Sequence, residues 1–515
     1  MFVNLLFHPI RAARRLLLPA LLLAATSVHA ALPIEHWTTS SGTRVYFVRA
    51  DAIPMLDLNL DFDAGGRRDP AAKTGLASLT NAMLFKGAPG LNESQIAEGF
   101  AVTGAQRGGG AGDDRASVSL RTLTSEAELG ASVNLLARVL AAPTFPADVL
   151  AREKARVIQA VREASTKPER IASRTFSRQL YGSHPYGAEA TAESYGAVER
   201  NDLVAFHSAN YGASRAVLSM IGAIPRARAE AIAEQLSRAL PAGTAAAPLP
   251  DVVMPQAGSV RRIEHPATQS HILIGLPAIA RGDPDYFPLL VGNYVLGGGG
   301  FVSRLYNEVR EKRGLAYSVY SYFSPQLQPG PFTIGLQTQK AQTDLALKVV
   351  GDTLDAFLKE GPTAEELVAA KANLIGGFPL RIDSNRKILD NLAVIGFYRL
   401  PFDYLDRWTE NIDRVTLPQI RQAFARVVRA DRLATVVVGA PAGTAAGAGS
   451  TSDAGSATGA GSATGAGSAT GAGSTTGAGS TTGAGSTMGA GGTTGAGSTA
   501  DAGSTAGAGA ATGAR

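Results

Sequence analysis

The chain has 515 residues, of which 45% are hydrophobic, and a formal net charge of +5. A chain of this length is too long for a single hydrophobic core, so we expect at least two domains. It contains no cysteine, which excludes disulfides and metal sites built from thiolates.

The first 30 residues have the features of a secretory signal peptide. Three arginines precede a short apolar run at residues 16–25, and Val28-His29-Ala30 has the small-residue pattern of a cleavage site. We expect cleavage after Ala30 and a periplasmic or secreted protein. A membrane anchor is the alternative, but the apolar run is short for a bilayer span. No later window is long and apolar enough, so we predict no stable membrane span.

The expected signal peptide contributes three of the five units of net positive charge. Its removal leaves 45 basic residues against 43 acidic ones. A chain so nearly balanced gives no indication of nucleic acid or of an acidic substrate as a partner.

The segment after the signal peptide contains one pattern twice. A strand-like run at residues 56–62 precedes Asp69 and a helical pattern, and a run at residues 271–276 precedes Asp283 and another helical pattern. The two aspartates are 214 residues apart. A second pair of matching positions, on two later helices, is 217 residues apart: Lys154 and Lys371. Two matches at nearly one offset predict a duplicated domain.

We therefore divide the chain into two homologous domains, residues 31–240 and 255–442, with a Pro- and Ala-rich linker at residues 241–254. In each domain, strand patterns of period two accompany long amphipathic helices. This combination predicts the α+β class, with an antiparallel-rich sheet layered with helices in each domain. Residues 443–515 repeat a Gly/Ala/Ser/Thr unit that cannot bury a core, and they are expected to form a disordered tail.

Three stretches resemble the insulinase/pitrilysin family of zinc metallopeptidases, which are inverzincins. The three stretches of this chain are DAGGRRDPAAKTGLASLTNAMLFKG at residues 63–87, LGGGGFVSRLYNEVREKRGLAYSV at residues 296–319 and HPYG at residues 184–187. Together they span most of the folded part, and the second stretch is the most specific. The resemblance implies a half-clamshell of two related α+β domains.

Active members of that family carry an H-x-x-E-H motif on the first helix. Two histidines four residues apart bind zinc, and the glutamate polarises the bound water. The matching positions in this chain are Ser78, Asn81 and Ala82. A third ligand of the family, a glutamate on a later helix, matches Gln159 or Ala160. The resemblance therefore implies a degenerate site that holds no metal, and zinc is expected only in a partner subunit.

The second domain keeps two residues that the family uses on a partner's substrate. A partner half supplies an arginine and a tyrosine that close over the scissile bond, and the matching positions are Arg313 and Tyr317. A guanidinium can hold a peptide carbonyl, and a phenol can donate a hydrogen bond to an oxyanion. We expect residues 308–313 to end a helix at Gly314 and residues 315–323 to form a strand. The alternative is structural, with Arg313 in a surface ion pair and Tyr317 packed on a sheet.

Two functions remain open. The first is a non-catalytic subunit of a heteromeric insulinase-type zinc peptidase, which completes the active site and chamber of a homologous zinc-bearing subunit that cleaves unfolded peptides. The second is a peptide-binding or assembly module with no peptidase activity.

Residues 108–112 match the sheet edge where relatives bind substrate by strand addition, although their glycine-rich sequence departs from the usual one. An active homodimeric peptidase would need a metal site that the sequence lacks.

Overall fold

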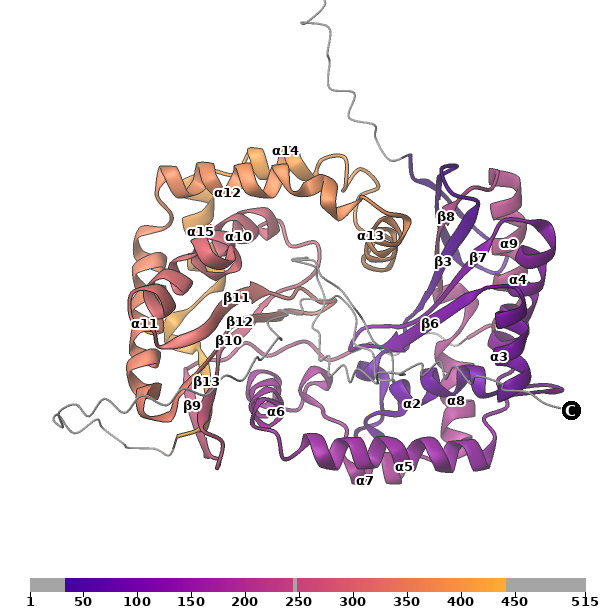
Figure 1. Ribbon diagram of the computed structural model, residues 1–515, viewed down its shortest axis with the longest axis horizontal. Coiled ribbons are helices and arrows are strands. Elements are labelled where there is room, and N and C mark those ends of the chain that lie inside the picture. Colours follow the sequence, from indigo (N-terminus) through magenta and orange to yellow (C-terminus); the bar gives the residue numbers. More distant parts are fainter. Residues whose placement is uncertain (1–32, 244–247, 441–515) are drawn as a thin grey trace, which may run out of the picture.

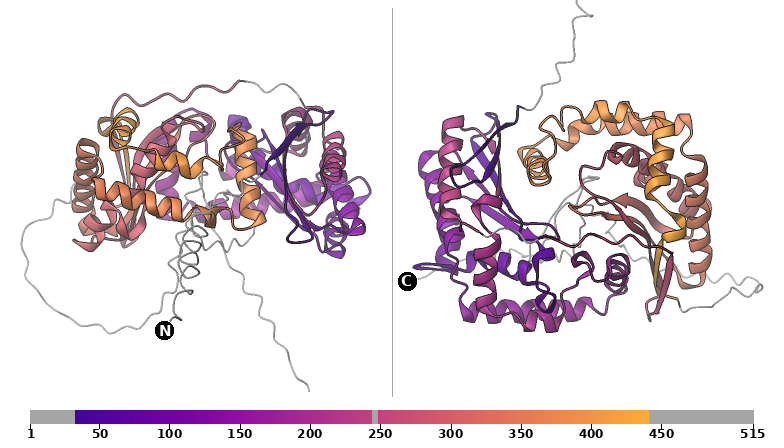
Figure 2. Two further views of the ribbon diagram at one scale, coloured as in Figure 1. Left: turned by 90° about the horizontal axis from the view of Figure 1, so that it is seen from above. Right: turned by 180° about the vertical axis from the view of Figure 1, so that it is seen from behind.

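The structure, a computed structural model, describes residues 33–243 and 248–440. The expected signal peptide (residues 1–30) and the expected tail (residues 443–515) lie outside the described residues. The described part forms two α+β halves that lie side by side, with one sheet in each half (Figures 1 and 2). The predicted fold class is therefore confirmed.

The N-terminal half contains a six-stranded sheet in the order β1-β2-β8-β3-β7-β6. β2 and β8 run parallel, and the other neighbouring pairs are antiparallel. The bounds, in sheet order, are β1 Glu35–Thr38, β2 Arg44–Arg49, β8 Val217–Gly222, β3 Met55–Phe62, β7 Ala116–Leu123 and β6 Gln106–Ala111. A two-residue pair, β4 Gly87–Ala88 and β5 Leu91–Asn92, forms a separate small ladder.

The C-terminal half repeats five strands of this sheet, and its described residues form no counterpart of β1. Its order is β9-β13-β10-β12-β11, with β9 and β13 parallel and the remaining neighbours antiparallel. The bounds are β9 Ser259–Glu264, β13 Ala434–Gly439, β10 Gln269–Ile279, β12 Gly330–Gln339 and β11 Ala316–Phe323. The shared order and directions show that the two halves are one domain duplicated.

Helices complete each half. Those encoded in the N-terminal half are α2 Leu76–Met83, α3 Glu93–Val102, α4 Glu126–Ala141, α5 Ala147–Ala164, α6 Pro168–Tyr181, α7 Ala192–Gly196, α8 Arg200–Asn210 and α9 Arg226–Ala239. Those encoded in the C-terminal half are α10 Tyr286–Asn293, α11 Thr343–Glu360, α12 Ala364–Gly376, α13 Asn385–Tyr398, α14 Trp408–Asp413 and α15 Leu417–Val427. Among the described helices, none combines the length and hydrophobicity that a bilayer span requires.

The two halves exchange one helix each. Helix α6 buries Ala172, Phe176 and Leu180 against the C-terminal sheet, and α13 packs on β8 and β3 of the N-terminal sheet (Figure 1). Each sheet is therefore covered by its own helices on one face and by a helix of the other half on the opposite face. This explains why every residue of β8 is buried, because a strand covered on both faces has no solvent side.

Close packing of α13 depends on Gly396. A Cβ atom at this position would lie 2.6 Å from Cγ1 of Val217 and 2.8 Å from Cε2 of Tyr46. We expect Gly396→Ala to lower the free energy of unfolding by about 1–3 kcal/mol, because the exchanged helix must move outward. The matched control is Gly351→Ala in α11, where a Cβ atom meets no neighbour. The control should stabilise the chain by up to about 1 kcal/mol through helix propensity. Equal midpoints of urea unfolding for the two variants would contradict the packing argument.

Asp114, which lies between β6 and β7, joins the two halves at a buried position. Its Oδ1 accepts a hydrogen bond from Oη of Tyr186 at 2.5 Å. Its Oδ2 accepts from Oη of Tyr398 at 2.9 Å and from the backbone N–H of Leu327 at 2.8 Å, and both residues belong to the other half. Nε of Arg67 lies 3.4 Å from Oδ1. Burial and the nearby carboxylate raise the pKa of both tyrosines, so their phenols remain protonated donors.

Candidate functional site

The residues that match the family's metal motif lie on α2, which starts at a fixed turn. Asp69 accepts hydrogen bonds from the backbone N–H groups of Gly75 at 2.6 Å and Ala77 at 2.7 Å, which satisfies donors at the helix N-terminus. Gly75 adopts a φ of +102°, a conformation that favours glycine. Ser78 and Ala82, four residues apart, therefore share one half-buried face of the helix, as the metal-binding histidines of the family do.

Asn81, at the position of the family's glutamate, is turned into the fold and only 7% exposed. Its Nδ2 donates to the backbone oxygen of Ser117 at 3.1 Å and to Oη of Tyr211 at 3.3 Å. Tyr211 is fully buried, with its ring 4.7 Å from that of Phe62. An uncharged amide cannot act as a general base, so this position has become a structural link. Sequence reasoning missed Tyr211, which no motif marks and which lies 130 residues from Asn81.

The two candidate positions for the third ligand point in different directions from α5. Gln159 and Ala160 are both exposed. Ala160 follows Glu153 by seven residues, two helical turns, so these two residues share one face. Oε1 of Glu153 lies 3.4 Å from Nζ of Lys86, just beyond the end of α2. The face that carries Ala160 thus turns toward the end of α2, whereas Gln159 lies on another side of α5.

The two buried histidines of the N-terminal half, His184 and His207, do not replace the lost ligands. His207 stacks on Tyr211 with ring centroids 5.1 Å apart, its Nε2 lies 3.1 Å from the backbone oxygen of Leu140, and burial lowers its pKa to about 4. His184 caps a turn, with Nδ1 accepting a backbone N–H two residues later. Within residues 33–243 and 248–440, no group of three or more His, Cys, Asp or Glu side chains is placed to hold a metal ion. The serine, two amides and alanines at the matching positions do not fit zinc, which binds nitrogen, sulfur or carboxylate ligands.

Strand β6 is the last strand of the N-terminal sheet and its residues are mostly exposed. A Cβ atom at Gly108 would lie 2.8 Å from Oγ of Ser119, and one at Gly109 would lie 2.5 Å from the backbone oxygen of Ser117. The glycines therefore let β6 approach β7 closely. A free sheet edge presents unpaired backbone groups, which suits strand addition by an extended peptide.

In the C-terminal half, Arg313 turns back onto its own helix. Its Nη1 lies 2.7 Å from Oε2 of Glu308 and donates to the backbone oxygen of that residue at 2.7 Å. The helical turn η8 runs over Tyr306–Glu311, two residues short of the predicted end at 313, and Gly314 with a φ of +61° ends it. Arg313 and Glu308 line a groove of about 500 Å³ beside α11, together with Val302, Ser303, Arg304, Asn307, Val349, Asp352, Thr353, Ala356 and Glu366.

Tyr317 stands at the start of β11 and is 70% exposed, so it is not packed on the sheet. Its neighbour is Arg310, whose guanidinium carbon lies 4.9 Å from the Tyr317 ring centroid. The structure therefore does not bring the two predicted site residues together, because Arg313 pairs with Glu308 and Tyr317 lies against a different arginine. Sequence reasoning missed Arg310, although it lies inside the quoted stretch at residues 296–319.

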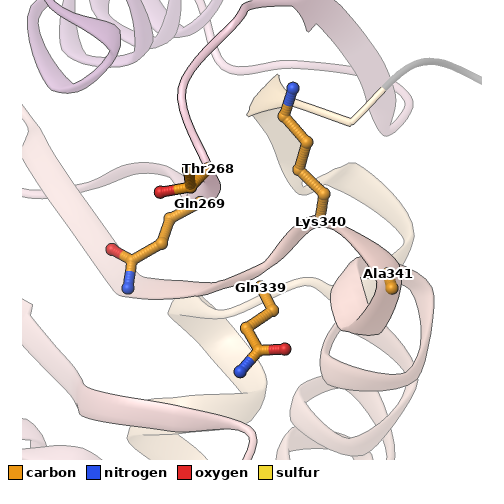
Figure 3. Close-up of a pocket in the computed structure, with 5 residues that line it drawn as sticks. All are labelled: Thr268, Gln269, Gln339, Lys340 and Ala341. Carbon is orange, nitrogen blue, oxygen red and sulfur yellow. The ribbon is translucent and has the colours of Figure 1, made fainter. Parts of the chain in front are cut away.

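A second hollow, of about 490 Å³, lies at the end of the ladder between β10 and β12 (Figure 3). Its lining residues are Thr268, Gln269, Gln339, Lys340 and Ala341. The side chains of Gln269, Gln339 and Lys340 extend from the ribbon in different directions (Figure 3). Nζ of Lys340 donates to the backbone oxygen of His265 at 2.6 Å. With one cation already engaged, this lining assembles no catalytic pair.

The duplicated fold and the altered motif on α2 define a peptidase-like protein whose own metal site is incomplete. Residues 47–192 match the family model for insulinase (peptidase family M16), and residues 197–374 match the model for the peptidase M16 inactive domain. The chain belongs to the insulinase family, M16. The resemblance drawn from the three stretches is thus confirmed.

Relatives and solved structures agree with this assignment. The crystal structure of a peptidase M16 inactive domain from Pseudomonas fluorescens is 40% identical and covers 80% of this chain and 98% of that one, with a TM-score of 0.77. A protease from Helicobacter pylori shares the fold at 18% identity and a TM-score of 0.71, over 79% of this chain and 99% of that one. An uncharacterized zinc protease of Mycobacterium leprae is 25% identical over 78% of this chain and 91% of that protein.

Proposed function

We propose that this chain is the non-catalytic subunit of a heteromeric zinc peptidase of the insulinase family. It pairs with a homologous zinc-bearing subunit, walls one side of a chamber for unfolded peptides, and presents Arg313 and Tyr317 to the active site of that subunit. Export through residues 1–30 would place the complex in the periplasm or outside the cell. The observation that carries the proposal is a contrast within the chain: α2 lacks every metal ligand, yet the Tyr317 phenol is 70% exposed.

Arg313 can serve this function despite its ion pair. The side chains of Arg313 and Glu308 are 41% and 30% exposed, so their attraction is screened and contributes roughly 0–1 kcal/mol. Exchanging Glu308 for a peptide carbonyl of the substrate therefore costs little. Tyr317 needs no rearrangement, because its ring already projects from the edge strand β11 into solvent.

The test is Tyr317→Phe in this chain, mixed with a co-encoded subunit that carries H-x-x-E-H. We expect kcat for an unfolded peptide to fall about 100-fold, because removing one donor to a developing oxyanion has an effect of this size. The matched control is Tyr320→Phe, which removes a phenol from the same strand and should leave kcat unchanged. Unchanged turnover in Tyr317→Phe would reject the proposed role of this residue.

The free edge of β6 supports a second candidate, a peptide-binding or assembly module without peptidase activity. Strand addition at Gly108 and Gly109 needs only backbone hydrogen bonds, and it does not require the lost metal ligands. A peptidase assay with metal analysis separates the two candidates, on this chain alone and on the mixture. Cleavage by the mixture but not by the lone chain supports the subunit function. Peptide binding without cleavage in either sample supports the module.

A further inference from the structure

Strand β9 is a free edge of the C-terminal sheet, although its equivalent in the N-terminal half is covered. In the N-terminal half, β2 runs parallel to β8, and β1 pairs antiparallel with its other side. In the C-terminal half, β9 runs parallel to β13, and no described strand pairs with its other side. Four residues of β2 are therefore buried, whereas none of β9 is. Figure 1 shows β9 at the outer margin of the C-terminal half.

The backbone groups on the free side of β9 follow from its pairing with β13. The N–H groups of Ser259 and His265 donate to backbone oxygens of the segment 433–439, on the β13 side. Alternate residues of a strand direct their N–H and C=O groups to opposite sides, so the residues between these two present both groups to the free side. These residues are Val260, Arg262 and Glu264. The edge carries no proline, and its register with β13 is continuous, so nothing in its backbone blocks a further strand.

Strand β1 shows how such an edge accepts a further strand. Arg44 on β2 and Ser259 on β9 are equivalent, because each donates its N–H to the residue just before the parallel neighbouring strand. β1 lies antiparallel to β2, opposite Val45 and Phe47. The matching positions on β9 are Val260 and Arg262. A guest strand in this register would run antiparallel to β9 and bind through backbone hydrogen bonds.

The side chains of β9 select which strand fits. Ile263 packs on the cluster that α6 covers, so Arg261, two residues away, projects from the same face of the sheet. Arg261 is exposed, and among the described side chains no carboxylate lies within ion-pair distance of it. On the opposite face, Arg262 is already paired with Asp344, and Val260 is 70% exposed. The edge therefore fits a carboxylate opposite Arg261, flanked by β-branched residues.

Two other occupants fit this edge poorly. When two copies of β9 pair about a two-fold axis, the registers that join the most residues place Arg261 or Arg262 opposite its own copy. Like charges directly opposite each other destabilise a sheet. The Gly/Ala/Ser/Thr repeats after residue 442 contain only two carboxylates, Asp453 and Asp501, so they offer almost no acidic strand. Charge complementarity thus favours a segment of a different protein.

We propose that the free edge of β9 is a docking site for an extended acidic segment of a partner protein. The segment pairs antiparallel, as β1 does on β2, and places a carboxylate opposite Arg261. It would complete the C-terminal sheet to six strands, the number found in the N-terminal half. The site lies at the sheet edge opposite β11, so it is separate from Arg313 and Tyr317. Failure of this proposal would leave the proposed function unaffected.

The charge test uses the full chain and two synthetic peptides, acetyl-TVEVT-amide and acetyl-TVKVT-amide. We expect the acidic peptide to bind about 10-fold more tightly at low salt, because opposite charges across a strand pair attract and like charges repel. It should also slow hydrogen exchange of the N–H groups at residues 260, 262 and 264. Arg261→Glu, an exposed substitution, should reverse the preference. Equal binding of the two peptides, or an unreversed preference in Arg261→Glu, would overturn the proposal.

The backbone test uses Val260→Pro, which removes one N–H group from the free side, where an edge strand tolerates proline. We expect binding of the acidic peptide to be lost, whereas the matched control Val260→Thr keeps the N–H group and should bind like the parent chain. Urea unfolding verifies that both variants are folded. Binding that survives in Val260→Pro would overturn strand addition. Slow exchange at these N–H groups without peptide would overturn the free edge, and its dependence on protein concentration would separate a second copy from the tail.

Discussion

The variant Ser78→His/Asn81→Glu/Ala82→His/Ala160→Glu is expected to bind about one zinc ion per chain, whereas the parent chain binds none. Residues 78 and 82 already lie four apart on a half-buried helical face. Ala160 lies on the face of α5 that approaches the end of α2 through Glu153 and Lys86. The measurement is the zinc content of the purified chain by mass spectrometry, followed by calorimetric titration.

The matched control replaces Gln159 instead of Ala160 with glutamate and keeps the other three changes. It should bind zinc much more weakly, because residue 159 lies on another side of α5. Loss of the Asn81 amide leaves the Tyr211 hydroxyl without a buried partner, so both variants should lose about 1–3 kcal/mol of stability equally. Zinc in the Gln159 variant alone would assign the third ligand to the other position. Zinc bound to the parent chain would contradict the inference that its own site holds no metal.

Asp114→Ala is expected to lower the free energy of unfolding by about 3–5 kcal/mol, the largest stability change we expect from a single substitution here. The substitution removes one carboxylate partner of the Arg67 guanidinium, whose side chain is only 2% exposed. It also removes the acceptor shared by Tyr186, Tyr398 and the backbone of Leu327. Urea unfolding measures the effect.

Asp113→Ala is the matched control for this result. The neighbouring carboxylate is exposed and accepts a hydrogen bond from Nε2 of Gln326 at 2.6 Å. Its removal should change the free energy of unfolding by no more than about 0.5 kcal/mol. Equal losses for Asp113→Ala and Asp114→Ala would mean that the effect comes from the loop and not from the buried network.

The sequence by itself determined the duplicated α+β fold and the loss of the metal ligands. Strand periodicity and the matching offsets of Asp69/Asp283 and Lys154/Lys371 are local features, readable wherever the elements pack. Residue identity alone is enough to show that Ala82 cannot bind zinc. The turn at Gly314 and the strand that follows it were predicted for the same reason.

Only the tertiary structure decided how these elements meet. The exchange of α6 and α13 depends on which sheet face lies nearer, and no periodicity encodes that choice. The partners of Asn81 and Asp114 include residues 130 and 284 positions away, so their hydrogen bonds exist only after the strands and the exchanged helix have packed. Arg310 was within a stretch already singled out, yet its contact with the Tyr317 ring depends on where η8 places its guanidinium. Contacts of this kind are set by packing geometry, which composition and spacing do not determine.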